Sequence, residues 1–193
     1  LDPAAHLRVL NPIASDQALM RTSLVPGILK NIRDNARHFG EFRLFEIGFE
    51  IHKRESSLPD EVPHLVATSY RKGSGGKTNL RELKHLAECL AGKVTIMAAT
   101  ARTYEHPARA FSVFVRDNLV GRIFEFHPSI LEERGSILDL DLHALEQARP
   151  PEHRYQPLRR FPTSALDLSI ITPAREYAYK LETVIRGSGP DLL

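Results

Sequence analysis

The stretch Leu10-Asn-Pro-Ile-Ala-Ser-Asp-Gln-Ala-Leu-Met-Arg-Thr-Ser-Leu-Val-Pro-Gly-Ile-Leu29, followed by Leu44-Phe-Glu-Ile-Gly48, decides the fold of this chain of 193 residues. Ser15 predicts the start of a short helix, because its hydroxyl can accept a hydrogen bond from a free helical N–H group. Pro26 suits the first turn of a second, longer helix, where its missing N–H is not needed. Gly40 then stands where a left-handed C-terminal cap is expected.

A strand is predicted over residues 42–53, where side chains alternate between the two faces of a sheet. One face is apolar and is expected to be dry; it carries Phe45, Ile47, Phe49 and Ile51. The other face is mixed and includes Glu46, Gly48, Glu50 and His52. Such a strand can form the floor of a ligand cleft, but an ordinary antiparallel strand with one wet face has the same pattern.

The rest of the chain alternates short strand and helix patterns. Strands are predicted over 64–70, 94–98, 110–116, 119–126, 137–142 and 166–171, and helices over 79–91, 128–134, near 144 and over 175–186. Asn79 with Glu82 resembles a capping box, Gly92 ends that helix, and Asp117-Asn118 suits a tight hairpin. Tyr177, Leu181, Val184 and Ile185 are expected to point inward from the last helix. This order predicts an α+β fold, an antiparallel sheet with helices packed on one side.

The composition is that of a globular protein without a membrane span. The apolar fraction is 42%, the charged fraction 26% and the net charge +2, which is too weak to indicate nucleic-acid binding by itself. The single cysteine, Cys89, excludes an intrachain disulfide and a thiolate metal cluster, and favours a cytoplasmic location. No signal peptide is visible and no initiator Met is present, so we expect a fragment of a longer chain.

Several strings occur in the order and spacing of one known family. The opening stretch resembles N-P-L-S-x-D/E-Q-x-x-M/L-R-T-S-L-L-P-G-L-L followed by F-E-I-G, the pattern of the bacterial phenylalanyl-tRNA synthetase beta subunit. Residues 79–84, 106–110, 121–128, 138–145 and 161–168 are similar to that family's D-F-F-D-L-K, H-P-G-R-S/A, G-x-I-G-E-L-H-P, F-E-L-D-L-D-A-L and F-P-A-V-R-R-D-L. The chain departs from these patterns at Ala108, Phe124, Ala165 and Leu166.

The resemblance implies a class II aminoacyl-tRNA synthetase-like fold, an antiparallel sheet with flanking helices. Residues 1–148 would be the non-catalytic core, truncated at its N-terminus, 149–160 a linker, and 161–193 the beginning of a ferredoxin-like anticodon-binding domain. The implied role is a scaffold that packs on the catalytic alpha subunit and supports the charging of tRNA with phenylalanine. tRNA would be reached through the full alpha2-beta2 assembly, and no contact with a membrane is implied.

The same resemblance indicates that the chain is not itself an enzyme. Class II enzymes hold ATP with an arginine on the strand equivalent to 42–53, and that position falls near His52, a poor substitute for a bidentate guanidinium. No late G-x-G-x-x-R string supplies the second arginine. We therefore expect no cofactor in this chain, with ATP and magnesium belonging to the full complex.

No catalytic, cofactor-binding or metal site is predicted from the residues. Arg21, Glu46 and Arg109 are the polar positions that we expect to matter structurally, the first two as an anchor between helix and sheet and the third in an ion pair. His106 and His127 each precede a proline, and a metal ion would need Glu125 or Asp139 as a further ligand, without any short ligand spacing in support. The loop at 73–78 lacks the first glycine of a phosphate loop.

Two other functions remain open from the residues. One is a free-standing nucleotide- or small-molecule-binding protein with a cleft over Glu46, Glu50 and His52. The other is a tRNA-binding module that uses the basic segment 149–160.

Overall fold

A computed structural model describes residues 6–14, 18–55, 57–73, 76–131, 135–148, 167–173 and 176–188. The chain divides into two compact units, residues 1–152 and 153–193, which are considered separately. In the described part of the chain, no helix is long and apolar enough to cross a membrane.

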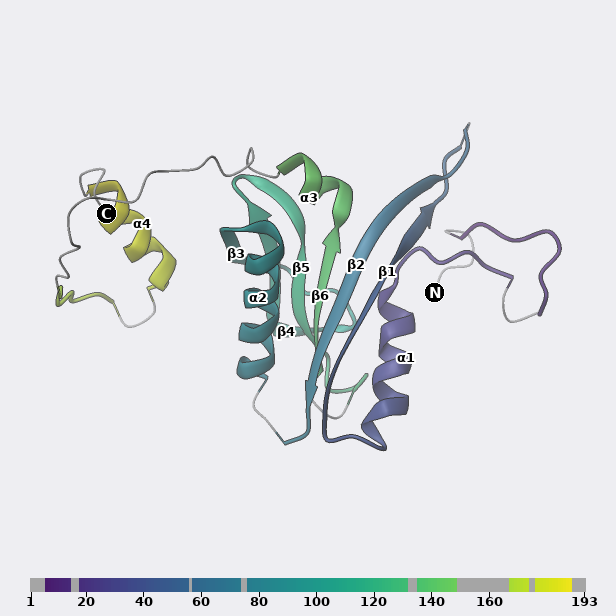
Figure 1. The fold of residues 1–193 in the computed structure, drawn as a ribbon, viewed down its shortest axis with the longest axis horizontal. Helices are drawn as coiled ribbons and strands as arrows, with labels where there is room; N and C mark the ends of the chain where they lie inside the picture. Colours follow the sequence, from purple (N-terminus) through teal and green to yellow (C-terminus); the bar gives the residue numbers. More distant parts are fainter. Residues whose placement is uncertain are drawn as a thin grey trace, which may run out of the picture. The chain divides into compact units, whose positions relative to one another are not determined.

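The first unit is built on a six-stranded antiparallel sheet (Figure 1). Its strands are β1 (Glu41–His52), β2 (Asp60–Arg71), β3 (Val94–Ala98), β4 (Glu105–Val115), β5 (Asn118–Phe126) and β6 (Gly135–Asp141). Their order across the sheet is β1-β2-β6-β5-β4-β3, so β1 and β3 are the edge strands. The pairing of β2 with β6 joins residues 64–70 to 135–141 and is the one step in this order between strands that are not neighbours in sequence.

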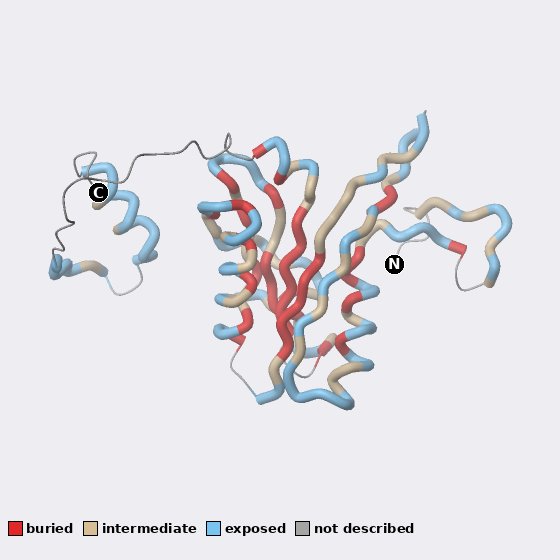
Figure 2. Tube along the Cα trace, in the orientation of Figure 1, coloured by how far each residue is buried: buried red, intermediate tan, exposed pale blue. Residues whose placement is uncertain are grey.

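Helices cover both faces of this sheet: α1 (Val25–Ala36) lies on one face, and α2 (Lys77–Ala91) and α3 (Leu142–Ala148) lie on the other. Consecutive residues of a strand point into the two hydrophobic cores on opposite faces of the sheet. Val66 thus packs in the core with Ile28 of α1, and Ala67 packs in the core with Leu83 of α2. Figure 2 shows the resulting buried residues running along the middle strands. The expectation of helices on one side only was therefore wrong, whereas Pro26 does lie in the first turn of α1.

The apolar face of β1 is exposed, contrary to the prediction. Phe45 is 73% exposed, Ile47 60% and Phe49 51%, although Ile51 is buried. β1 is an edge strand, and α2 covers the sheet further in, over β2, β5 and β6. The opposite face of β1 packs toward α1, where Phe42 stacks on Tyr70 of β2 with ring centroids 4.7 Å apart. Alternation was thus read correctly, but the buried face was assigned to the wrong side.

Several turns also differ from their prediction. α1 ends at Arg37 in a right-handed conformation, and Gly40 is not left-handed. In the β4–β5 hairpin the residue with positive φ is Arg116 (55°), not Asp117 or Asn118. Residues 128–130 form a turn without a helix, and Gly135 belongs to β6. Leu19 pairs with Arg8 in an isolated bridge where a short helix was predicted, while Ser15 itself lies outside the described residues.

α2 begins earlier than predicted. Its N-cap is Gly76, and Asn79 is a fully buried residue inside the helix, so the predicted capping box does not form. Glu82 instead binds Ser69 on β2, whose hydroxyl donates to its Oε2 at 2.7 Å. The predicted end of the helix is confirmed, because Gly92 follows it with φ 78°.

The second unit contains one described helix, α4 (Ala178–Ser188). None of the described residues in 167–188 is buried, and Tyr177 and Val184, which were predicted to point inward, are 58% and 64% exposed. Residues 167–171 form no strand, and position 166 lies outside the described residues, as does the predicted linker at 149–160.

Candidate functional site

Arg21, which precedes α1, binds the edge strand β1 through its side chain and its backbone. Its Nη1 donates to Oε1 of Glu46 at 2.6 Å, and its Nε donates to the carbonyl oxygen of Phe49 at 2.9 Å. Its own carbonyl oxygen accepts a hydrogen bond from the N–H of Ile51 at 2.8 Å. The structure thus brings together two of the three polar positions singled out from the sequence, and they join the segment before α1 to the sheet.

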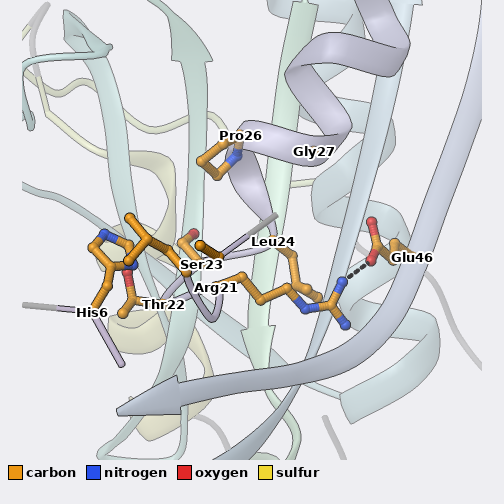
Figure 3. A pocket seen from close by; sticks show the side chains of 10 residues that line it. His6, Arg21, Thr22, Ser23, Leu24, Pro26, Gly27 and Glu46 are labelled. Atoms are coloured by element: carbon orange, nitrogen blue, oxygen red, sulfur yellow. Dashed lines mark hydrogen bonds and ion pairs between the residues drawn. The ribbon is translucent and has the colours of Figure 1, made fainter. Parts of the chain in front are cut away.

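Gly48 makes this close approach possible. A Cβ atom at position 48 would lie 2.2 Å from Nη2 of Arg21, so any larger residue would displace the guanidinium. Arg21 and Glu46 line a cavity of about 410 Å³ together with residues on either side of the start of α1. In Figure 3 the Arg21 side chain extends toward Glu46, with Pro26 and Gly27 at the start of the helix beyond it.

A second polar cluster lies on three strands: Glu50 and His52 on β1, His64 on β2 and Asp139 on β6. His64 donates from Nδ1 to Oδ1 of Asp139 at 2.8 Å, and its Nε2 lies 3.6 Å from Oε2 of Glu50. The Nε2 atom of His52 lies 3.5 Å from the same Oε2. Oε1 of Glu50 accepts a hydrogen bond from the backbone N–H of Leu24 at 3.1 Å, which fixes the carboxylate.

Burial shapes the charges of this cluster. The pKa of Glu50 is raised because burial penalises its carboxylate, while the nearby His64 opposes that effect. Burial alone would lower the pKa of His64, but the hydrogen bond to Asp139 and the charges of Asp139, Glu50 and Asp141 outweigh it, so the pKa of His64 is raised.

Sequence reasoning placed Glu50 and His52 on one face of the strand but missed their link to His64 and Asp139, because these residues lie far apart in the chain. His64 and Asp139 are 75 residues apart, and only the β2–β6 register, in which Val66 pairs with Asp139, brings them together. The histidines that were considered as ligands have other neighbours. Nδ1 of His106 accepts a hydrogen bond from the N–H of Ala108 at 3.1 Å, and Nδ1 of His127 accepts one from the N–H of Ser129 at 3.2 Å.

Two buried carboxylates are paired with arginines near β4 and β5. Arg109, the third position singled out, donates from Nη1 to Oε1 of Glu125 at 2.9 Å. Arg122 donates from Nε and Nη2 to the two oxygens of Glu105 at 3.0 and 2.6 Å. The second pair was not foreseen, since an alternating strand pattern does not reveal which residue lies opposite a charge.

An exposed apolar surface, here called the β1 surface, consists of Phe45, Ile47 and Phe49. Beside it lies a groove of about 420 Å³ between β1 and α2, which Phe45, Leu86 and Leu90 help to line. Isolated exposed apolar side chains are ordinary, but three in a row beside an apolar groove indicate a contact surface.

Comparison with known proteins gives consistent matches over this chain. The family model described as the phenylalanyl tRNA synthetase beta chain CLM domain matches residues 2–139. The chain is 49% identical over 191 residues to the phenylalanine–tRNA ligase beta subunit of Solibacter usitatus, and 28% identical over 204 residues to that of Moorella thermoacetica. These alignments cover 98% and 97% of the chain but 25% of each relative, so the chain spans about a quarter of their length.

Solved structures agree at the level of the fold. A crystal structure of pyrrolysyl-tRNA synthetase from Desulfitobacterium hafniense superimposes with a TM-score of 0.58 at 15% identity, covering 75% of this chain and 53% of that one. The predicted α+β fold, an antiparallel sheet of class II synthetase type with flanking helices, is confirmed.

Proposed function

The chain belongs to the family of phenylalanine–tRNA ligase beta subunits, and on that basis we propose that it is a non-catalytic scaffold domain that packs on the catalytic alpha subunit. In this role it supports the charging of tRNA with phenylalanine without taking part in the reaction. We expect this function to be exercised in the cytoplasm. There the full assembly would contact tRNA and would bind ATP and magnesium.

The β1 surface is the observation that carries the proposal. Phe45, Ile47 and Phe49 expose apolar side chains on an edge strand, where burial against another protein removes them from water. The adjoining groove between β1 and α2 can receive an apolar side chain from that protein. A beta subunit acts with a partner subunit, so we assign this surface to the alpha subunit.

The pairing of the charged residues around the sheet supports a non-catalytic role. An ATP site needs free cations for the phosphates, but Arg21 is bound to Glu46, and Arg122 is bound to a fully buried carboxylate. His52, near the position where the resemblance would require an arginine, lies beside Glu50 instead.

Co-expression with the alpha subunit of the same genome tests the assignment. We expect the two chains to co-purify and the double variant Phe45→Asp, Phe49→Asp to weaken their association at least tenfold, because charges would enter an apolar interface. Met97→Asp is the matched control, since Met97 is 48% exposed on the other edge strand, β3, and should leave binding unchanged. Equal binding by the double variant and the control would contradict the assignment.

The cavity at Arg21 and Glu46 is the feature on which the competing possibility, a small-molecule or nucleotide site, depends. Its lining is mostly apolar, and its one ion pair is internally neutral, which suits an anionic nucleotide poorly. Titration of the isolated chain with ATP decides between the two. Saturable binding that is lost in Glu46→Ala would favour the nucleotide site over the scaffold.

A further inference from the structure

We propose that Glu50, His64 and His52 form a binding site for a divalent transition-metal ion, for which Zn²⁺ is the best match, with Asp139 orienting His64. Glu50, His64 and Asp139 each offer a ligand atom within 4.8 Å of the others, and His52 lies beside Glu50. The site lies on β1, β2 and β6 and does not depend on the proposed contact with an alpha subunit.

The distance between Glu50 and His64 matches that between two ligands of one ion. Oε2 of Glu50 lies 3.6 Å from Nε2 of His64 and 3.5 Å from Nε2 of His52, both beyond an ordinary hydrogen bond. Two ligands of a tetrahedral Zn²⁺ with bonds of about 2.0–2.1 Å stand about 3.3 Å apart. Shifts of a few tenths of an ångström therefore place a metal ion between Glu50 and His64. His52 is not among the residues whose ligand atoms lie within 4.8 Å of one another, so its half-exposed ring must turn toward His64 to become the third ligand.

The Asp139 contact has the form expected of an outer ligand shell. Asp139 accepts the Nδ1–H of His64 at 2.8 Å, so that in the neutral ring it is Nε2, on the side of Glu50, that is left to bind a metal. Carboxylates that hold metal-binding histidines in this way fix both the tautomer and the orientation of the ring. Imidazole nitrogens combined with a carboxylate oxygen favour zinc and its neighbours over magnesium or calcium.

The charge balance favours a cation at this place. The side chains of Glu50 and Asp139 are only 8% and 10% exposed, and a dication compensates the charge of two carboxylates beside neutral imidazoles. The neighbouring cations Arg21 and Arg122 are already bound to other carboxylates. His52 is half exposed, which gives an ion a route from solvent.

Metal titration of the 193-residue chain tests the proposal. The protein is freed of metal with a chelator and titrated with Zn²⁺ by calorimetry and with Co²⁺ by visible absorption. The titrations use a His85→Ala, Cys89→Ser background, because Nε2 of His85 and Sγ of Cys89 lie 3.6 Å apart on α2 and could bind metal themselves. We expect one ion per chain, Co²⁺ d–d bands, and a Tm at least about 5 °C higher when Zn²⁺ is a hundredfold above its Kd.

Variants locate the ion. Glu50→Gln and His64→Gln should weaken Zn²⁺ binding at least a hundredfold, His52→Ala at least tenfold and Asp139→Asn about tenfold to a hundredfold. Glu46→Gln, on the same face of β1 but outside the cluster, is the control and should bind as the parent does. Circular dichroism checks that each variant is folded. His52→Ala changes a half-exposed side chain and should therefore disturb the core least. No Zn²⁺ binding by the parent, or undiminished binding by Glu50→Gln and His52→Ala, would overturn the proposal.

Discussion

Position 48 has no room for a side chain larger than that of glycine, because the side chain of Arg21 lies across it. A Cβ at this position would stand 2.2 Å from Nη2 and 3.2 Å from Cζ, and the guanidinium is held there by Glu46 and the carbonyl of Phe49. The glycine and the arginine are therefore in direct contact. In the sequence they belong to two separate strings that resemble the family pattern, one at 10–29 and one at 44–48.

Gly48→Ala should therefore destabilise the protein by about 1 kcal/mol, because it expels Arg21 from a half-exposed ion pair and a hydrogen bond. In an Arg21→Ala background the same substitution should be neutral or stabilising by about 0.5 kcal/mol, since glycine weakens a strand. Urea unfolding of the four proteins in this cycle measures the coupling. An equal cost of Gly48→Ala in both backgrounds would show that the two residues act separately.

At the scale of single residues, the sequence singled out polar positions but did not identify their partners. Arg21 and Glu46 were singled out separately, each in its own recognisable string on either side of α1, and their pairing was not predicted. His64 and Asp139 were not linked, because their contact depends on the register between β2 and β6. Hydrophobic alternation gives the face of a residue but not the strand beside it.

At the scale of the elements, side chains connect β4 to β5 where the regular pairing of the two strands is interrupted. The register shifts between Glu105 and Ala110, so regular pairing is lost at the beginning of the strand. Arg122 of β5 spans this gap with its two bonds to Glu105 and a third to the carbonyl of Thr100 at 3.0 Å. These side-chain bonds thus connect β5 to Glu105 and Thr100 beside the register shift.

Arg122→Ala should cost about 3 kcal/mol of unfolding free energy, because it removes the nearest counter-ion of the fully buried carboxylate of Glu105 and leaves only Arg102, at 4.0 Å. The double variant Arg122→Met, Glu105→Gln should recover part of this loss, since glutamine can still accept the hydrogen bond from the N–H of Arg102. Arg43→Ala breaks the exposed ion pair with Glu82 and serves as the control, at less than about 1 kcal/mol. Denaturant unfolding of these variants gives the comparison, and similar costs for the buried and exposed pairs would contradict the account.

Most elements of the first unit could be predicted from the sequence, and the exceptions have physical reasons. Strands 94–98 and 119–126 and the end of α2 follow from alternation and from Gly92. β1 was found, but its apolar face was assumed to be buried, because a strand pattern does not state that the strand lies at an edge. The predicted strand at 166–171 is not formed over residues 167–171, the described part of that range.

On the scale of the whole chain, the two units are unequal. The first has two buried cores on either side of its sheet, whereas the described residues of the second are exposed or half-buried. The assignment of 161–193 to the beginning of a ferredoxin-like domain remains a prediction.

A chain that ends at residue 152 should unfold with a Tm within about 2 °C of the full chain, because no buried residue has been described beyond that point. Calorimetry of both chains makes the measurement, and a peptide of residues 153–193 should show no cooperative transition. A drop of more than about 5 °C on truncation would show that the second unit contributes to the stability of the first.

The pairing of β2 with β6 has a consequence for how the polypeptide is made. The middle of the sheet cannot close until residues 135–141 have left the ribosome, although β1 and β2 emerge much earlier. During that interval the nascent hairpin presents apolar side chains on both of its surfaces, and it needs chaperones or its remaining strands to protect them. Slow translation between the codons for residues 72 and 135 should lengthen this vulnerable period and lower the yield of native protein.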